Sequence, residues 1–441
     1  MNANVAQEKQ KEQSLTPQEQ FTGKNLTRFG GAGLIRRFFE KHKLGRELQT
    51  VSVRDRRNSD FSPAHMCMGM LYALMLGIFR PSHMMELVRD KVFQSVARLR
   101  KFPVQSTISR FLDKVTVHTA IQIAEINSRL LNVTRGGFEK FKALTLDLDS
   151  HVITVFGKQH RANKGYNPKK RGRKSHHPLL CFIGETRDYL GGILRPGNST
   201  DANQARSFLT LMLRKLPFGM VTRLRADSGF FHMDFIRWLI WRGIEFYIVV
   251  PQLVYIQKLV LRIGTWREIS PNVAVGETSL PLNSQRKLRL VVVRKTVRTG
   301  EKPRKQLKLF KAQPVAYDYQ VISTSSLDAV ETVWRFYNKR ACCENFIKEG
   351  IYGFGLDKSV CRSWAGAKVH FELVMLAYNL MNWFKEEALS RGANKEMAGT
   401  IRWRLFWIPA KLVATGRRLI LKLAEDWVFR DQFEKAVKTL T

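Results

Sequence analysis

The sequence predicts an α/β protein in which a mixed sheet lies between helical regions. Apolar residues recur with helical spacing over residues 62–112 and again after Asp328, whereas the stretch between them is rich in strand-like alternation. The chain has 441 residues, 44% of them hydrophobic, which is enough for about three folding units with their own cores.

The charge balance is strongly basic. The chain has 74 Lys and Arg against 37 Asp and Glu, a formal net charge of +37. A folded chain with this excess repels itself, and a polyanionic partner is the usual reason for it. We therefore expect nucleic acid as the partner.

A membrane partner is not expected. The longest uncharged apolar run, residues 66–79, has 14 residues, whereas spanning a bilayer takes about 20. The first 20 residues are polar and lack the apolar core of a signal peptide, so we expect a cytosolic protein located with its DNA.

The N-terminal third divides into a tail and a helical region. Residues 1–25 are polar and are predicted to be disordered, and residues 26–138 are predicted to be helical. Pro103 and Ser106 mark the start of a helix that carries Arg110 in its first turns. Short helices around this polar segment suit a helix-turn-helix-like DNA reader, with Arg110 as a contact, although a helical bundle that contacts no base remains open.

Strand patterns begin at Lys142. Over residues 139–250, three strand-like segments are followed by alternating helices and strands, the last helix closed by Gly243. This order predicts a sheet with an antiparallel beginning and a parallel end, as in ribonuclease-H-like proteins. Residues 251–326 lose the helical signal and are predicted to be a β-rich insertion. Residues 327–390 are predicted to complete the core, and residues 391–441 to form a basic helical C-terminal region.

Three acidic positions carry the sharpest chemical signal. Asp147 and Asp149 lie two apart on a strand and share one face of the sheet, and Asp227 ends an apolar strand. Glu344 lies on a helix, four residues after Arg340. Carboxylates that converge need a cation, and their hard oxygen donors suit Mg²⁺, with Mn²⁺ as a substitute. Two such ions support in-line displacement at a phosphodiester. The alternative is that each acid is a turn former or a partner of Arg.

The segments LDLDS, RADSGF and YNKRACCENFIKEG resemble the three blocks of the DDE transposases of bacterial insertion sequences. The branch of this family that the three segments resemble has a β-rich insertion before the glutamate and a Tyr-x2-Arg-x3-Glu-x6-Lys signature. Tyr337, Arg340 and Glu344 match this signature in type and spacing. The last position is Ile351, and the nearest lysine is Lys348, one helical turn beyond Glu344. The resemblance extends over residues 142–380.

The resemblance implies specific roles for these residues. Asp149, Asp227 and Glu344 would bind the catalytic metal ions, with Asp147 as the alternative to Asp149. Tyr337, Arg340 and Lys348 would contact phosphates near the scissile bond, for which the planar fork of Arg is well suited. Residues 26–138 would bind the element's ends. The expected location is the bacterial nucleoid.

A basic segment follows the first acidic strand. Residues 157–177 contain eight Lys or Arg and no acid, a composition that suits contact with a DNA backbone. They are Lys158, Arg161, Lys164, Lys169, Lys170, Arg171, Arg173 and Lys174. A second run over residues 286–311 has eleven basic residues and one acid, Glu301. Either run could instead be a solvated face.

The sequence thus predicts a transposase that binds terminal inverted repeats, cleaves DNA with Mg²⁺ and joins a 3′-hydroxyl to target DNA. Pairing of two ends requires at least a homodimer. Two alternatives remain: a ribonuclease-H-like nuclease that cuts without joining, and a catalytically idle DNA-binding descendant of a transposase.

Overall fold

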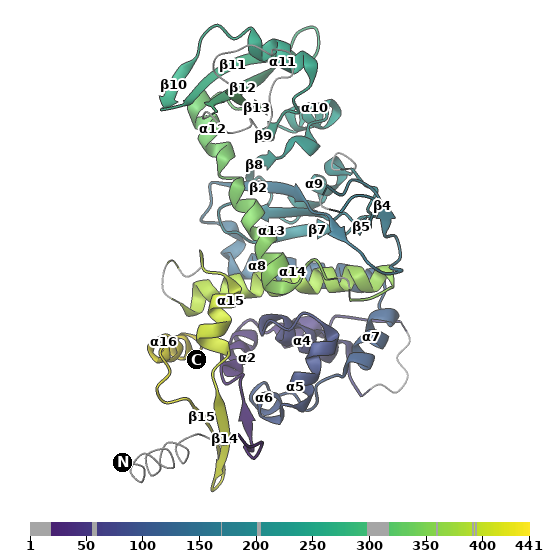
Figure 1. The fold of residues 1–441 in the computed structure, drawn as a ribbon, viewed down its shortest axis with the longest axis vertical. Helices are drawn as coiled ribbons and strands as arrows, with labels where there is room; N and C mark the ends of the chain where they lie inside the picture. Colours follow the sequence, from purple (N-terminus) through teal and green to yellow (C-terminus); the bar gives the residue numbers. More distant parts are fainter. Residues whose placement is uncertain are drawn as a thin grey trace, which may run out of the picture.

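The computed structural model describes residues 19–54, 60–168, 170–200, 204–297, 317–358, 360–389, 392 and 395–441. The molecule is elongated: a strand-rich lobe forms one end, helices and a C-terminal hairpin form the other, and a sheet lies between them (Figure 1). The expected polar tail falls largely in residues 1–18, outside the described part.

A sheet of nine described strands runs through the middle and upper part of the molecule in the order β10-β11-β12-β13-β9-β8-β2-β6-β7. Its strands are β2 (Ala143–Ser150), β6 (Leu179–Ile183), β7 (Tyr189–Ile193), β8 (Val221–Ala226), β9 (Glu245–Val249), β10 (Arg267–Ser270), β11 (Val273–Pro281), β12 (Lys287–Thr296) and β13 (Tyr317–Thr324). Strands β2, β6 and β7 pair antiparallel, whereas β2, β8 and β9 pair parallel. The predicted mixed sheet, antiparallel first and parallel later, is confirmed.

The β-rich segment differs from the prediction in two ways. Strand β13 pairs antiparallel with β9, so β10 to β13 extend the main sheet. The segment also contains a helix, α11 (Val254–Leu261), which the sequence pattern did not predict. Its buried Ile256 and Val260 are four apart, and this helical spacing is hidden among β-branched residues that favour strands.

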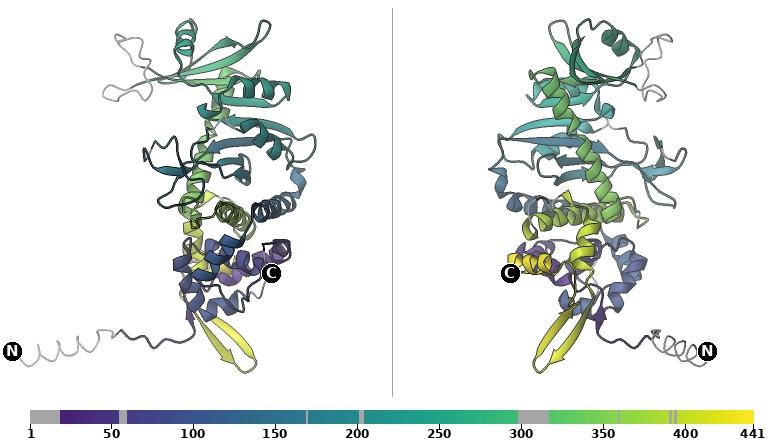
Figure 2. Two further views of the ribbon diagram at one scale, coloured as in Figure 1. Left: turned by 90° about the vertical axis from the view of Figure 1, so that its right-hand side faces the viewer. Right: turned by 60° about the vertical axis from the view of Figure 1, so that its left-hand side comes forward.

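Helices cover the two faces and the lower edge of the sheet. They are α8 (Val117–Thr134), α9 (Ala205–Leu213), α10 (Met233–Trp241), α12 (Val330–Asn338), α13 (Ala341–Phe354) and α14 (Trp364–Ala388), with short 3₁₀ turns at Gly136–Phe138 and Ser228–Phe230. Helix α14 is buried on nearly all sides, since it contacts α8 and β7 as well as the N-terminal helices α4 (Pro63–Met75) and α7 (Gln105–Lys114). Its Asn379 accepts a hydrogen bond from the Tyr189 backbone N–H at 2.8 Å. Helix α14 therefore joins the sheet to the helical end (Figures 1 and 2).

The N-terminal region is helical, as predicted. It consists of α2 (Ala32–Lys41), α3 (Leu44–Leu48), α4 (Pro63–Met75), α5 (Met85–Arg89), α6 (Lys91–Val96) and α7 (Gln105–Lys114), with a 3₁₀ turn at Pro81–Met84. Ser62 caps α4 by accepting from the His65 N–H at 3.1 Å, and Asp90 caps α6 by accepting from the Phe93 N–H at 2.7 Å. Such caps satisfy N–H groups that have no partner within the helix.

The C-terminal region departs from the helical expectation. Helix α15 (Ala398–Ile401) and a π-helical turn (Arg402–Phe406) are followed by a hairpin of β14 (Ala410–Thr415) and β15 (Arg418–Leu423), then by α16 (Arg430–Leu440). Strand β14 pairs with β1 (Leu26–Thr27) near the N-terminus. Pro409 cannot continue a helix, and Gly416 supplies the turn at φ +56°. The prediction of a wholly helical region was wrong for residues 410–423.

The basic segment after β2 has its own small sheet. Strands β3 (Ile153–Thr154), β5 (Lys174–His176) and β4 (Asn163–Lys164) pair in that order.

None of the helices in the described ranges is long and apolar enough to span a bilayer.

Two buried groups on α14 give a testable pH dependence. Burial lowers the pKa of His370 to about 4 from an ordinary value of 6.5, so the unfolded chain binds more protons between these values and stability is lost as the pH falls through this window. Burial raises the pKa of Glu372 to about 7 from 4.5, which has the opposite effect. The pH dependence of wild-type stability therefore does not separate the contributions of His370 and Glu372.

We expect His370→Gln to remove the first effect. Relative to wild type, the variant's free energy of unfolding should improve by about 2 kcal/mol between pH 7 and pH 5. Urea denaturation of both proteins at both pH values measures this difference. Parallel pH profiles would contradict the assignment.

Candidate active site

The parallel pairing of β2 and β8 brings two of the predicted acids together. In this register Asp147 lies opposite Arg225. Two residues further along each chain are Asp149, still in β2, and Asp227, just past the end of β8. Asp227 also accepts a hydrogen bond from the Gly229 N–H at 3.0 Å, which fixes the turn after β8. The carboxyl end of a strand is where open α/β sheets place functional groups.

Asp147 forms a buried ion pair with Arg225. The Arg225 guanidinium donates to its two carboxylate oxygens at 2.6 and 2.7 Å, and both side chains are almost fully buried. Arg225 also donates to the Phe336 carbonyl at 3.0 Å. Asp147 and Asp149 share a face of β2, but only Asp149 contacts the cation shared with Asp227 and Glu344.

Helix α13 supplies the third acid. Glu344 lies in its first turn, and α13 packs on β2. The segment is divided between α12 and α13, and Arg340 lies at the N-cap of α13, just before the helix that carries Glu344. This break places the Arg340 side chain beside the sheet edge.

Arg340 is the centre of the carboxylate cluster. Its Nη2 lies 3.0 Å from Asp149 Oδ2 and 3.9 Å from Asp227 Oδ2, and its Nη1 lies 3.9 Å from Glu344 Oε1. The structure thus brings the three predicted acids around a single cation. The side chains become more exposed in the order Asp149 (10%), Asp227 (37%) and Glu344 (58%), so the cluster opens to solvent at Glu344.

Burial dominates the titration of Asp149. It raises the pKa of this carboxyl to about 7; Asp227 adds to the shift and Arg340 opposes it. The ionised form of this buried carboxyl is therefore stabilised only by a nearby positive charge.

The donor chemistry fits a divalent ion. The three carboxylates offer hard oxygen ligands of the kind that Mg²⁺ and Mn²⁺ prefer. Within the described residues, no three His, Cys, Asp or Glu side chains lie close enough together to hold a metal ion. Arg340 lies among these carboxylates, so the guanidinium would have to move for an ion to be shared by all three.

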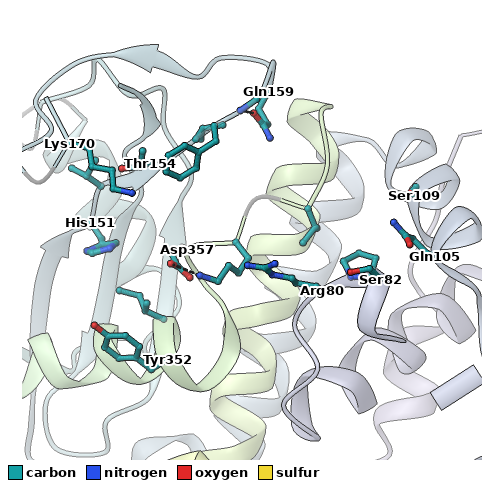
Figure 3. A pocket seen from close by; sticks show the side chains of 18 residues that line it. Arg80, Ser82, Gln105, Ser109, His151, Thr154, Gln159, Lys170, Tyr352 and Asp357 are labelled. Carbon is teal, nitrogen blue, oxygen red and sulfur yellow. Dashed lines mark hydrogen bonds and ion pairs between the residues drawn. The ribbon is translucent and has the colours of Figure 1, made fainter. Parts of the chain in front are cut away.

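A cleft of about 590 Å³ lies between the segment after β2, the end of α13 and the N-terminal helices, and none of the three carboxylates lines it. It is bounded by His151, two residues after Asp149, by Tyr352 of α13, and by Arg80 and Gln105 from the N-terminal helical region (Figure 3). Glu344, Lys348 and Tyr352 are four residues apart on α13 and share one face. This face therefore leads from the carboxylates to the cleft.

Comparison with known proteins decides the family. The family described as "Transposase DDE domain group 1" matches residues 9–441. The chain belongs to this transposase family. A solved piggyBac transposase synaptic complex with hairpin DNA is also similar, with 11% sequence identity, a TM-score of 0.46, and coverage of 85% of this chain and 79% of the other. No curated protein matches the chain.

The remaining predicted site residues of this transposase differ in accessibility. Lys348 is exposed on α13, whereas Tyr337 is buried in a small apolar cluster with residues of β9, β12 and β13. Burial raises the pKa of Tyr337 to about 12. Arg110 is exposed on α7, where its guanidinium donates to Ser106 O at 3.3 Å and Thr107 Oγ1 at 3.4 Å.

The basic segment of the transposase contributes to one wall of the cleft through Gly157, Gln159 and Lys170. Seven of its eight predicted cations are exposed, and Lys169 lies outside the described residues. Lys170 lines the cleft and lies 4.5 Å from the ring centroid of the exposed Phe156. Most of the second basic run, residues 298–311, also lies outside the described part.

Several residues of this region were not predicted from the sequence. Arg225 is recognisable only after the β2–β8 register is known. Tyr352 carries a signal, since it is eight residues beyond Glu344 on a helix. Arg80 carries none, because its approach to the cleft depends on packing between the N-terminal region and the core.

Arg340 gives a prediction for the metal-free transposase. Arg340→Gln leaves a buried carboxyl beside two other acids, and we expect about 3 kcal/mol loss of stability. We also expect Mn²⁺ to raise the melting temperature more in this variant than in wild type, because the ion no longer competes with the guanidinium. Arg335→Gln, which removes an exposed i,i+4 pair on α12, is the control and should cost at most about 0.5 kcal/mol. Equal effects from the two substitutions would contradict the central position of Arg340.

Proposed function

We propose that this chain catalyses cut-and-paste DNA transposition: it binds the terminal inverted repeats of a mobile element, cleaves the DNA with Mg²⁺ and joins the 3′-hydroxyl to a target. The observation that carries the proposal is the convergence of Asp149, Asp227 and Glu344 on one cation at the edge of a mixed sheet. The family membership supports the general activity. The fold it implies for the core is the ribonuclease-H-like one.

Asp149, Asp227 and Glu344 would hold the metal ions. Bound Mg²⁺ supplies activation of a water or 3′-hydroxyl and stabilisation of the leaving oxygen in phosphodiester displacement. The protein's own backbone and side chains orient these carboxylates and neutralise their charge. Asp149 is held by the Ser150 N–H, which donates to Oδ1 at 2.8 Å, and its other oxygen remains directed at Arg340.

Arg340 would change partner during the reaction. Without DNA its guanidinium neutralises the carboxylates, and with metal and DNA present it would turn to a phosphate next to the scissile bond. Lys348 is exposed one turn beyond Glu344 and would contact the same backbone. Tyr337 would support Arg340 by packing, and a direct DNA contact by Tyr337 would require it to leave its apolar cluster.

The cleft at the end of α13 would receive the DNA strand. Arg80 and Lys170 supply positive charge on opposite walls, and the exposed rings of Phe156 and Tyr352 are suited to contact bases. Gln105 and Ser109 of α7 line the same cleft, so a DNA end bound by the N-terminal region would enter it and follow the exposed face of α13 toward the carboxylates. Two ends would require a homodimer, and the protein would act in the cytosol on nucleoid DNA.

A strand-transfer assay tests the proposal. A labelled duplex that ends in the element's terminal repeat with a free 3′-hydroxyl is incubated with plasmid and Mg²⁺. We expect covalent joining of the label to the plasmid. Hydrolysis without joining would favour the structure-specific nuclease, and end binding without either reaction would favour the idle DNA-binding protein.

A further inference from the structure

The C-terminal hairpin projects from the helical end of the molecule (Figures 1 and 2). Strand β14 pairs with β1 only at Ala410 and Lys411, while β14 and β15 pair with each other along their whole length. Six residues of strand extend about 20 Å. Beyond its base the hairpin is thus a two-stranded ribbon, a form that has little stability alone in water.

The register gives this ribbon two chemically different faces. Lys411 lies opposite Lys422, Val413 opposite Ile420, and Thr415 opposite Arg418, and these side chains share one face. The other face carries Leu412, Ala414, Leu419, Leu421 and their neighbours at the base. Arg417 adds a charge in the turn.

The charged face has no counterion of its own. Residues 410–424 contain four Lys or Arg and no acid. Lys411, Arg417, Arg418 and Lys422 are exposed, and none forms an ion pair with any described residue. Two lysines directly opposite each other repel, so the arrangement favours an anion placed across both strands.

The apolar face is turned in part toward the protein itself. Leu421, Leu423 and the adjoining Lys422 line a cavity of about 440 Å³ together with Trp427, Phe433, Glu425 and Glu434 from the segment that follows the hairpin. Lys411, Arg417 and Arg418 do not line this cavity and remain for an external partner. A two-stranded ribbon is narrow enough to enter the major groove of duplex DNA.

We propose that the basic face of the β14–β15 hairpin is a second duplex-DNA contact, distinct from the cleft at the end of α13. It rests on the proposed function, since it names a further part of the same DNA substrate: duplex outside the scissile region, held through its phosphates. The hairpin would anchor the DNA at the helical end while the cleft receives the strand to be cut.

The test compares two triple variants with equal loss of charge. One has Lys411→Gln, Arg418→Gln and Lys422→Gln. The control has Lys258→Gln, Lys435→Gln and Lys438→Gln, which are exposed positions on α11 and α16. Binding to a duplex that carries one terminal repeat with its flank is measured by fluorescence anisotropy over a range of salt concentrations. Thermal unfolding checks that both variants are folded.

We expect the hairpin variant alone to have a shallower salt dependence, by about two to three units of slope, since each lost phosphate contact removes about 0.9. Its footprint should lose a discrete stretch of protection and keep the rest. Equal slopes for the two variants would overturn the inference. Unchanged DNA binding with an altered sedimentation mass would also overturn it and make the hairpin a protein interface. Failure of the wild type to bind the duplex would instead contradict the proposed function.

Discussion

Asp227→Asn should abolish Mg²⁺-dependent nicking of terminal-repeat DNA while binding of that DNA is retained. The substitution preserves shape and removes one of the two acids within 4 Å of Arg340 Nη2. A loss of about 4 kcal/mol of transition-state stabilisation corresponds to about a thousandfold in rate. Single-turnover nicking and anisotropy, measured on the same protein, give the two quantities.

The matched control is Asp234→Asn. Asp234 is 78% exposed on α10, seven residues further along the chain, and forms a surface pair with Arg237. It should nick at the wild-type rate. Normal nicking by Asp227→Asn would remove Asp227 from the site, and loss of DNA binding by this variant would mean that the defect is not chemical.

Asp147→Asn should have the largest effect on stability. The change leaves the Arg225 guanidinium buried without a counterion, and breaking a buried pair in this way costs about 3–5 kcal/mol. Arg225→Met should cost less, because burial already raises the pKa of Asp147 and a carboxyl can take up a proton, whereas a guanidinium cannot lose one. Urea denaturation of both single variants and the double variant measures the coupling between the two residues.

Asp60→Asn provides the surface comparison. Asp60 is 78% exposed and 3.8 Å from Lys101, so its removal should change stability by at most about 1 kcal/mol. The Asp147 variant, once folded, should still nick DNA. A variant with wild-type stability and no nicking would reverse the assignment and make Asp147 the metal ligand.

The sheet and the acids were predictable from the sequence for different reasons. Strand alternation around Asp147 and Asp149, and the turn after Asp227, are local sequence patterns, and the folded chain forms the same strand and turn. The convergence of Glu344 with them depends on contacts almost 200 residues apart in the chain, and it was inferred through the resemblance to a family. The preference for Asp149 over Asp147 as the first metal ligand has a physical basis only in the structure, where Arg225 donates to both carboxylate oxygens of Asp147.

Other features could not be predicted because tertiary context overrides local preference. Helix α11 forms from β-branched residues, since Ile256 and Val260 are buried together. The C-terminal hairpin is rich in Leu, Lys and Arg, which are good helix formers and favour a helix, although Pro409 marks the start of the hairpin and Gly416 its turn. The cleft depends on how the N-terminal helices pack on the core, which no local pattern contains.

Anomalous diffraction from crystals of the protein bound to a terminal-repeat duplex and soaked in Mn²⁺ tests the central claim most directly. We expect anomalous density at an ion coordinated by carboxylate oxygens of Asp149 and Asp227, with Arg340 displaced toward a DNA phosphate. Mn²⁺ bound by Asp147 instead, or ordered DNA at the carboxylates with Arg340 still between them and no anomalous density, would contradict the account.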